Sequence, residues 1–284
     1  MTPVPARKGA PHAPGPAPPK KSLGQNFLVD GRVRSRIVQA ADLSPDDLVV
    51  EVGPGRGFLT RPLVERAGRV VAVEMDEALA GWLRESFADQ PTLTIVAADA
   101  REVDIGSLVG GSASYKLVAN LPYYAASPIV RRFLEAGRKP ALIVVMVQRE
   151  VAQTMTAPPG KMGLLSVATQ LYGRPRIVCH APPRAFRPAP KVTSSVVRID
   201  VFAEPAIALD SRERFFDLVR AGFSANRKQL RNSLTNGLGI PPQDAAALLA
   251  RAGIDPTRRA QTLDLVEWAA LYETYRAYAS PSPA

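Results

Sequence analysis

A glycine-rich segment, Glu51-Val-Gly-Pro-Gly-Arg-Gly57, limits the folds open to this chain more than any other feature of the sequence. It follows a short apolar stretch at 48–52 and precedes a segment with helical spacing at 58–66. A strand, a tight glycine turn and a helix in this order begin a βαβ unit, and the glycines let the backbone approach a ligand closely. Phe58 stands where the dinucleotide fingerprint has its third glycine, so the pattern disfavours NAD as the ligand.

Strand-like and helix-like segments alternate along the first two thirds of the chain. Apolar stretches predict strands at 48–52, 69–74, 93–97, 116–119, 141–147, 177–179 and 194–201, and helices are expected at 58–66, 77–87, 128–136 and 150–155. Such alternation predicts an α/β fold with a doubly wound, Rossmann-like sheet and helices on both faces. We expect this domain to span residues 20–203.

The two ends of the chain differ in composition from this domain. Residues 1–19 are mostly Pro, Ala and Gly, with too few large apolar groups to offset the entropy lost on ordering, so we expect a disordered tail. After a linker at 204–209 the apolar residues recur at helical spacing, which predicts a small all-helical domain at 204–284. Asp264 and Glu267 form a capping-box pattern for a last helix that reaches Tyr278.

Composition excludes several classes of protein. The 284 residues, 46% hydrophobic, can bury the core of one large and one small domain. The sequence has no run of eighteen apolar residues and no secretory signal pattern, so we expect a cytoplasmic protein without membrane attachment. The single cysteine, Cys179, precludes an internal disulfide, and with only His12 and His180 we expect no metal site.

The excess positive charge is concentrated in one third of the chain. The formal net charge is +10, and residues 105–199 alone carry thirteen Lys or Arg against Glu135 and Glu150, a net of +11. This concentration favours a polyanionic partner such as nucleic acid. The candidate phosphate contacts, each of which can equally be a solvated surface charge, are Lys161, Arg184, Arg187, Lys191, Arg220, Arg227, Lys228 and Arg231.

Acidic residues near the strand ends are candidates for binding a nucleoside. Glu74 lies about 20 positions after Gly53, where an acidic residue can accept hydrogen bonds from both ribose hydroxyls. Asp99 follows the third strand and can accept a hydrogen bond from an adenine amino group. We assign Glu51 to orienting the glycine loop or the amino group of a methionine moiety. Together with the close backbone approach at Gly53 and Gly55, these residues fit S-adenosylmethionine, which has a ribose but no pyrophosphate.

The segment Asn120-Leu-Pro-Tyr123 has the chemistry needed to methylate an exocyclic amine. The lone pair of an adenine amino group is delocalised into the ring, which makes the amine a poor nucleophile. The Asn120 side-chain carbonyl and the backbone carbonyl of Leu121 can accept the two amino hydrogens and so localise the lone pair. Pro122 stiffens the turn and leaves that backbone carbonyl free, and Tyr123 can stack on the base.

A further loop is predicted before the first helix, at Ser22-Leu-Gly-Gln-Asn-Phe-Leu28. Phe27 and Leu28 would anchor it and hold the amides of Gln25 and Asn26 near the ligand. The alternative is an ordinary hydrophobic staple at the start of the helix.

Six stretches of the chain, in this order, resemble the KsgA family of small-subunit rRNA adenine N6,N6-dimethyltransferases. They are Lys20-Lys-Ser-Leu-Gly-Gln-Asn-Phe-Leu28, Glu51-Val-Gly-Pro-Gly-Arg-Gly-Phe-Leu-Thr60, Asn120-Leu-Pro-Tyr-Tyr124, Gln148-Arg-Glu-Val151, Phe186-Arg-Pro-Ala-Pro-Lys-Val192 and Phe223-Ser-Ala-Asn-Arg-Lys-Gln-Leu-Arg-Asn-Ser-Leu234. The resemblance implies transfer of two methyl groups from S-adenosylmethionine to each of two adjacent adenosines, in a hairpin near the 3′ end of that rRNA. The small ribosomal subunit is then the partner, and we expect a monomer.

The resemblance also implies roles for individual residues. It places the cofactor among Asn26, Leu28, Gly53, Glu74, Asp99 and Asn120, to which the loop pattern adds Gln25, Glu51 and Gly55. Phe186 is similar in position to an aromatic residue that closes over the target base, and the alternative is a core aromatic before a turn. Ala125 and Ala126 stand where the family often has larger or polar residues, so the rim of the base pocket differs here.

Three other functions remain open at this point. The large-subunit rRNA adenine methylases that confer macrolide resistance resemble this chain in the N-terminal loop and the glycine motif. They usually have Ile at the position of Leu121 and lack the pattern at 227–234. DNA adenine methylases share a related Asn-Pro-Pro-Tyr motif but carry a target-recognition domain that this chain lacks. From a different class, the protein can be a factor that binds the assembling small subunit, with methylation secondary or lost.

Overall fold

The computed structural model of the protein describes residues 18–20, 23–225 and 227–279. Most of the tail predicted at 1–19 therefore lies outside the described residues. The strands are β1 (Phe27–Leu28), β2 (Leu48–Val52), β3 (Arg69–Glu74), β4 (Leu93–Ala97), β5 (Lys116–Asn120), β6 (Leu142–Gln148), β7 (Gly173–Ala181), β8 (Phe186–Arg187) and β9 (Ser194–Val201). The α-helices are α1 (Gly31–Ala41), α2 (Thr60–Val64), α3 (Glu77–Ser86), α4 (Ile105–Val109), α5 (Ala126–Glu135), α6 (Arg149–Met155), α7 (Leu164–Tyr172), α8 (Arg212–Gly222), α9 (Leu230–Leu238), α10 (Pro242–Arg251) and α11 (Leu265–Ala279).

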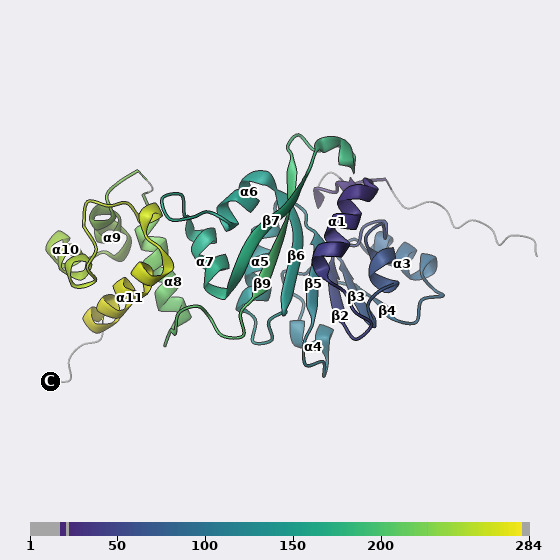
Figure 1. The fold of residues 1–284 in the computed structure, drawn as a ribbon, viewed down its shortest axis with the longest axis horizontal. Coiled ribbons are helices and arrows are strands. Elements are labelled where there is room, and N and C mark those ends of the chain that lie inside the picture. Colours follow the sequence, from purple (N-terminus) through teal and green to yellow (C-terminus); the bar gives the residue numbers. More distant parts are fainter. Residues whose placement is uncertain (1–17, 21–22, 226, 280–284) are drawn as a thin grey trace, which may run out of the picture.

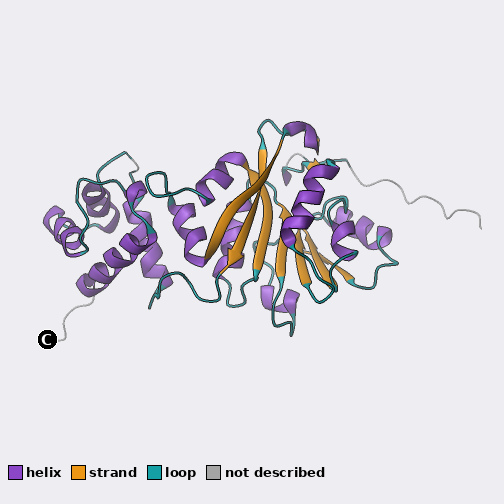
Figure 2. Cartoon of the chain, in the orientation of Figure 1, coloured by secondary structure: helices purple, strands orange, loops and turns teal. Residues whose placement is uncertain are grey.

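A seven-stranded sheet in the order β4-β3-β2-β5-β6-β9-β7 forms the centre of the larger part of the molecule (Figures 1 and 2). The neighbouring strands β4, β3, β2, β5 and β6 pair in parallel, and β9 alone runs antiparallel to both of its neighbours. The central strands are almost continuous runs of Val, Ile, Leu and Ala, because helices cover both faces of the sheet and leave no side for polar residues. The structure confirms the predicted doubly wound α/β fold.

The two faces of the sheet belong to separate hydrophobic clusters. Val50 and Val52 of β2 point into a cluster that includes residues of α4, α5 and α7, whereas Val49 points into a cluster with residues of α1 and α2. This division follows from the two-residue period of side chains along a strand. Strands β3 and β4 lie on one side of β2, and the next strand in the sequence, β5, lies on its other side. The order therefore reverses between β2 and β5, where sheets of this kind bind their ligands.

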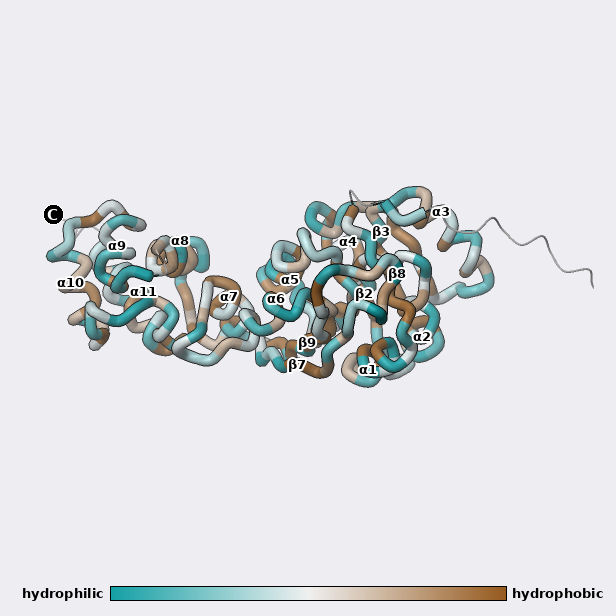
Figure 3. The backbone as a smooth tube through the Cα atoms, turned by 90° about the horizontal axis from the view of Figure 1, so that it is seen from above, coloured by the Kyte–Doolittle hydropathy of each residue, from teal (hydrophilic) through white to brown (hydrophobic). Residues whose placement is uncertain are grey.

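Helices α8 to α11 form the smaller part of the molecule and lie together at one end of it (Figure 3). They pack around Trp268, which is fully buried, and their core is continuous with the cluster on the α5 and α7 face of the sheet. Hydrogen bonds also join the two parts, since the Gly160 amide donates to the Gln261 carbonyl at 2.8 Å and the Arg212 guanidinium donates to the Glu135 carbonyl at 2.9 Å.

Some elements were not predicted or were predicted too short. Helices α4 and α7 and the two-residue pairing of β1 with β8 have no counterpart in the sequence predictions. Strand β7 extends over Gly173–Ala181, whereas the sequence predicted only 177–179. Pro175 and the exposed Arg174 and Arg176 obscure the strand pattern, but β7 lies at the edge of the sheet, where proline and charged residues are tolerated.

The predicted capping box at the start of α11 is present, and it gives a test of the helical part. The Glu267 amide donates to Asp264 at 2.8 Å and the Asp264 amide donates to Glu267 at 3.0 Å. We expect Asp264→Ala to lower the free energy of unfolding by about 1 kcal/mol, because a backbone donor loses its partner. Chemical denaturation would measure this loss. Val266→Ala, in the same turn at a side chain that is 75% exposed, is the control and should change stability by less than about 0.5 kcal/mol. Equal effects of the two variants would contradict the prediction.

Candidate functional site

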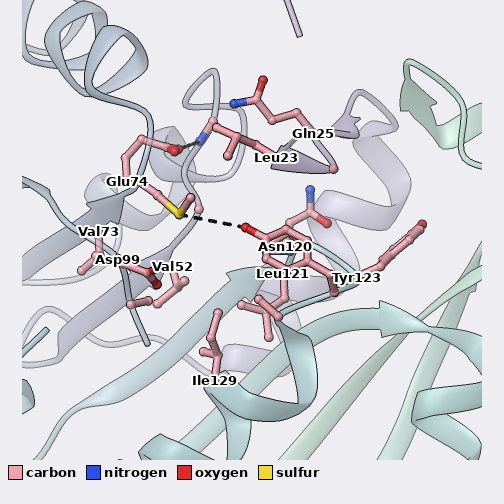
Figure 4. Close-up of a pocket in the computed structure, with 18 of the residues that line it drawn as sticks. Leu23, Gln25, Val52, Val73, Glu74, Asp99, Asn120, Leu121, Tyr123 and Ile129 are labelled. Carbon is pink, nitrogen blue, oxygen red and sulfur yellow. Dashed lines mark hydrogen bonds between the residues drawn. The ribbon is translucent and has the colours of Figure 1, made fainter. Parts of the chain in front are cut away.

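A cavity lies at the carboxyl ends of β2, β3 and β5, at the reversal of the strand order (Figure 4). Its walls come from the N-terminal segment, the glycine loop, the ends of three strands and the start of α5. The structure brings together ten of the predicted site residues there: Gln25, Asn26, Gly53, Gly55, Glu74, Asp99, Asn120, Leu121, Pro122 and Tyr123.

The glycine loop forms one wall by following a path that other residues rarely adopt. Gly53 and Gly55 have φ angles of 70° and 56°, in the left-handed region that favours glycine. A Cβ atom on Gly55 would lie 2.9 Å from the Phe27 ring, so a side chain at this position would collide with the segment that covers the loop. The loop is held by hydrogen bonds from the Gly53 amide to the Val73 carbonyl at 2.9 Å and from the Gly55 amide to Glu74 at 3.0 Å.

Glu74 ends β3 and is buried beside the loop. One carboxylate oxygen accepts from the Gly55 amide and the other from the Asp76 amide at 3.0 Å. Burial raises the pKa of Glu74, and these two backbone donors partly offset that effect. Each oxygen can accept a second hydrogen bond, so the fixed carboxylate can still receive two hydroxyl groups from the cavity.

Asp99 reaches the same cavity from the turn after β4. Its carboxylate is paired with Arg101, whose Nε donates to both oxygens at 3.1 and 3.0 Å. Hydrogen bonds from Arg101 lower the pKa of Asp99, which is therefore a carboxylate at neutral pH. The Arg101 guanidinium lies 5.7 Å from the centre of the Tyr124 ring, so these three side chains form one edge of the cavity mouth.

Asn120 stands at the end of β5 with its amide oriented. Its Nδ2 donates to the Asn26 carbonyl at 3.1 Å. Within the described residues no hydrogen bond reaches its Oδ1 or the backbone carbonyl of Leu121. Pro122 accepts the Ala125 amide at 3.0 Å instead, which turns the chain into α5. Asn120 and Leu121 both line the cavity, so each has an acceptor oxygen there that no described donor occupies.

Tyr123 is fixed by β9. Its hydroxyl lies 2.7 Å from the hydroxyl of Ser194, which is completely buried. Burial raises the pKa of Tyr123, and the hydrogen bond with Ser194 offsets part of this change. The ring is half-buried and therefore retains a surface on which a planar group can stack.

The N-terminal segment is tied to the start of α3 by a buried carboxylate. Asp76, the N-cap of α3, accepts from Lys20 Nζ at 2.8 Å and from Gln25 Nε2 at 3.2 Å. Burial alone would raise the pKa of Asp76, but these two donors outweigh it and the pKa is lowered. Gln25 was predicted to contact the cofactor, and it does line the cavity. Its side-chain amide is bonded to Asp76, and this bond anchors the N-terminal segment that covers the cavity.

Three predicted site residues lie behind the cavity wall. Leu28 and Phe186 are both buried and face each other in the β1–β8 pairing. Glu51 is only 1% exposed and its Oε2 has no hydrogen-bond partner within the described residues. Burial raises the pKa of Glu51 to about 8, with the neighbouring Thr60 opposing this shift and Glu74 adding to it. Glu51 is therefore a protonated, buried residue of β2, two positions before Gly53.

Three residues at the cavity mouth were missed by the sequence predictions, namely Arg101, Met75 and Tyr124. Met75 and Tyr124 are large apolar side chains that stay 40% and 49% exposed, and their Sδ and hydroxyl oxygen lie 4.0 Å apart. Each directly follows a predicted site residue or motif, and that adjacency is the signal that would have found them. The eight predicted phosphate contacts, from Lys161 to Arg231, all have exposed side chains.

A metal cluster and a membrane-spanning helix are both absent from the part of the chain that the structure describes. No group of three or more His, Cys, Asp or Glu side chains is arranged to hold a metal ion there. None of the described helices is long and apolar enough to cross a membrane.

Comparison with known proteins gives consistent matches over nearly the whole chain. The family model for ribosomal RNA adenine dimethylases matches residues 18–276. Ribosomal RNA small subunit methyltransferase A from Dehalococcoides mccartyi is 47% identical over 256 residues, which cover 90% of this chain and 88% of that protein. The protein of the same name from Pelotomaculum thermopropionicum is 44% identical over 269 residues, covering 90% and 91%.

Two solved structures extend the comparison. The 23S rRNA methyltransferase ErmE aligns with a TM-score of 0.68 and 31% identity, covering 88% of this chain and 99% of that one. A dimethyladenosine transferase from Plasmodium falciparum aligns with a TM-score of 0.77 and 21% identity, covering 88% and 98%, and supports the fold.

The protonation of Glu51 predicts a pH-dependent stability. Because its folded pKa of about 8 lies above the ordinary value of 4.5, the folded protein keeps a proton that the unfolded chain loses, and stability falls as pH rises from 4.5 to 8. Glu51→Gln removes this dependence. A pKa shift of this size makes the wild type lose roughly 3 kcal/mol between pH 5 and pH 8. We therefore expect the melting temperature of the variant relative to wild type to rise by about 6–12 °C over that range, at roughly 2–4 °C for each 1 kcal/mol in a protein of this size. The exposed Glu65→Gln is the control, and a pH-independent difference for Glu51→Gln would refute the assignment.

The anchor at Asp76 predicts a role in cofactor affinity. Asp76→Asn keeps the helix cap but removes the charge that holds the half-exposed Lys20. We expect the Kd for S-adenosylmethionine to rise about threefold to fivefold, because such a pair contributes up to ~1 kcal/mol. Equilibrium binding would measure it. Asp104→Asn, at the cap of α4, removes a comparable carboxylate away from the cavity and should leave the Kd unchanged. Equal Kd values for both variants and wild type would show that the anchor has no effect.

Proposed function

The chain belongs to the ribosomal RNA adenine dimethylase family, and on this premise we propose that it methylates N6 of two adjacent adenosines in the 3′-terminal hairpin loop of small-subunit rRNA. It is an enzyme that uses S-adenosylmethionine as methyl donor and gives N6,N6-dimethyladenosine. The reaction serves maturation of the small ribosomal subunit. The observation that carries the proposal is the pair of available oxygens, Asn120 Oδ1 and the Leu121 carbonyl, at a cavity closed by the glycine loop.

The side chains of the cavity fit the cofactor. Glu74, fixed by two backbone amides, can receive the two ribose hydroxyls. The Asp99 carboxylate can accept from the adenine amino group, in competition with Arg101. Gly53 and Gly55 leave room for the methionine part beside the backbone, since neither carries a Cβ. When bound, S-adenosylmethionine supplies a methyl group on a sulfonium, which is already a strong electrophile.

The protein's task is then to make the amine nucleophilic. Asn120 Oδ1 and the Leu121 carbonyl accept the two N6 hydrogens, which draws the nitrogen lone pair out of conjugation with the ring. The Asn26 carbonyl holds the Asn120 amide so that this oxygen keeps its orientation. No general base with a matched pKa is required, because the proton can leave after the methyl group has been transferred. Catalysis is mainly orientation and exclusion of water.

Tyr123 provides the surface for the base. Its hydroxyl is fixed by Ser194, so the ring has one orientation against which an unstacked adenine can lie. A loop nucleotide is released from its neighbours at lower cost than a paired one, which favours a hairpin in RNA over duplex DNA. Phe186 is buried beneath β1, so closing over the base would require this part of the chain to move.

The small subunit is favoured over the large one as substrate by the relative similarities. Identity reaches 47% with proteins named small subunit methyltransferases but is 31% with the large-subunit enzyme ErmE. We assign residues 20–203 to cofactor binding and catalysis and residues 204–284 to rRNA binding. The exposed cations from Lys161 to Arg231 come from both parts and would contact the rRNA phosphates. A cytoplasmic monomer is part of this proposal.

Methyl transfer from labelled S-adenosylmethionine to unmethylated small subunits, naked rRNA and large subunits would test the function. We expect N6,N6-dimethyladenosine only in the small-subunit reaction. Label in large-subunit rRNA would favour the resistance-type methylase instead. Cofactor binding without transfer to any of the three substrates would favour a non-catalytic assembly factor.

The same assay tests the central residue. We expect Asn120→Ala to lower the rate of transfer by at least about a hundredfold, because the amine loses the acceptor that orients it. Binding to small subunits should stay within about twofold of wild type. Tyr123→Phe keeps the ring and is the matched control, with a loss below about tenfold. A strain carrying Asn120→Ala that assembles subunits normally without the methyl groups would separate catalysis from assembly, whereas similar rates for Asn120→Ala and wild type would exclude the proposed mechanism.

A further inference from the structure

A second cavity lies on the other side of the wall formed by Phe27 and the glycine loop. It shares Phe27, Gly53, Gly55 and Asn120 with the cofactor cavity. Its outer rim carries four arginines, Arg34, Arg56, Arg61 and Arg187, which come from α1, the glycine loop, α2 and β8. We call this second cavity the arginine cleft. It has no acidic residue among those that line it in the described part of the chain.

Three of these arginines are held by aromatic rings. The guanidinium carbons of Arg34, Arg56 and Arg61 lie 4.4, 4.7 and 5.2 Å from the ring centres of Phe58, Phe27 and Phe87. A guanidinium placed over a ring is oriented by the contact while its N–H groups remain able to donate at the edges. In the described residues Arg34, Arg61 and Arg187 form no ion pair with a carboxylate. At these three positions the cleft therefore carries positive charge that no described carboxylate neutralises.

The position of the cleft relative to Asn120 limits what can occupy it. Leu121 and Tyr123, the proposed contacts of the target base, line the first cavity together with Glu74 and Asp99, so the methyl donor and the base share that cavity. The arginine cleft shares Asn120 with it but is lined by neither carboxylate, so it adjoins the target nucleotide rather than the ribose of the donor. Planar, fixed guanidinium groups match phosphate oxygens, which accept two parallel N–H bonds from them.

We propose that the arginine cleft binds the RNA phosphates that flank the target adenosine, and that it thereby sets the direction in which the strand enters the site. The proposal rests on the function proposed above. It adds Arg34, Arg56 and Arg61 to the nucleic-acid surface. The charge count along the sequence missed these three, because they lie outside the basic segment at 105–199.

The test uses the double variant Arg34→Gln/Arg61→Gln in the full chain. The control is Arg32→Gln/Arg66→Gln, which removes two exposed arginines near the ends of α1 and α2 that do not line the cleft. We expect the cleft variant to raise KM for unmethylated small subunits about tenfold, with kcat within about threefold and the Kd for S-adenosylmethionine within about twofold. The control should match wild type in all three.

Binding of the 3′-terminal hairpin RNA without cofactor, followed against salt concentration, separates this proposal from the proposed function. Each lost phosphate contact should reduce the slope of log K against log salt by about 1, so the cleft variant should lose roughly 1–2 and the control none. If the wild-type enzyme binds the hairpin but transfers no methyl group, the proposed function is overturned. The salt dependence of hairpin binding would still test whether the arginine cleft binds RNA phosphates. An unchanged slope and KM in the cleft variant, with an unaltered melting temperature, would overturn the proposal.

Discussion

The hydrogen bond from the Gly55 amide to the buried carboxylate of Glu74 joins the two strand ends on which the rest of the site depends. It fixes the loop after β2 against the end of β3, and the same carboxylate accepts the amide of Asp76, which caps α3. The loop in turn lies under Phe27, so the N-terminal segment closes over a surface that glycine alone permits. A carboxylate at this position is costly to bury, and its two backbone donors offset part of that cost.

Four acidic residues near the cavity differ in pKa because their surroundings differ. Glu51 is buried without a basic partner and its pKa of about 8 keeps it neutral at pH 7. Asp76 and Asp99 each have a basic partner, Lys20 and Arg101, which lowers their pKa and keeps them charged. Glu74 lies between these extremes, since burial raises its pKa while backbone amides hold its charged form. Glu74 and Asp99 therefore line the cavity, Asp76 anchors the segment that covers it, and the neutral Glu51 lies outside its lining.

The sequence predicted the features that depend on local pattern. Continuous apolar runs identified the buried strands, and the reciprocal bonds of Asp264 and Glu267 were predicted from their spacing alone. The contributions of Met75 and Tyr124 depend on which loops meet at the cavity mouth, and that is a property of the strand order. The burial of Phe186 depends on the short pairing of β8 with β1, segments that are 157 residues or more apart and too short to carry a strand pattern. Edge strand β7 was underestimated because its exposed face tolerates proline and arginine.

The two cavities that meet at Asn120 explain why so few groups in the site need to act as acids or bases. The two cavities share Phe27, Gly53, Gly55 and Asn120, so the encounter of the methyl donor with the amine is decided by the positions of these groups. Holding two reactants in this way can contribute roughly 7–11 kcal/mol to lowering a barrier. The Asn26 carbonyl links the two tasks, because it belongs to the segment that covers the cofactor and also holds the Asn120 amide. Ordering of that segment by a bound cofactor would therefore also orient the oxygen that accepts the adenine amine.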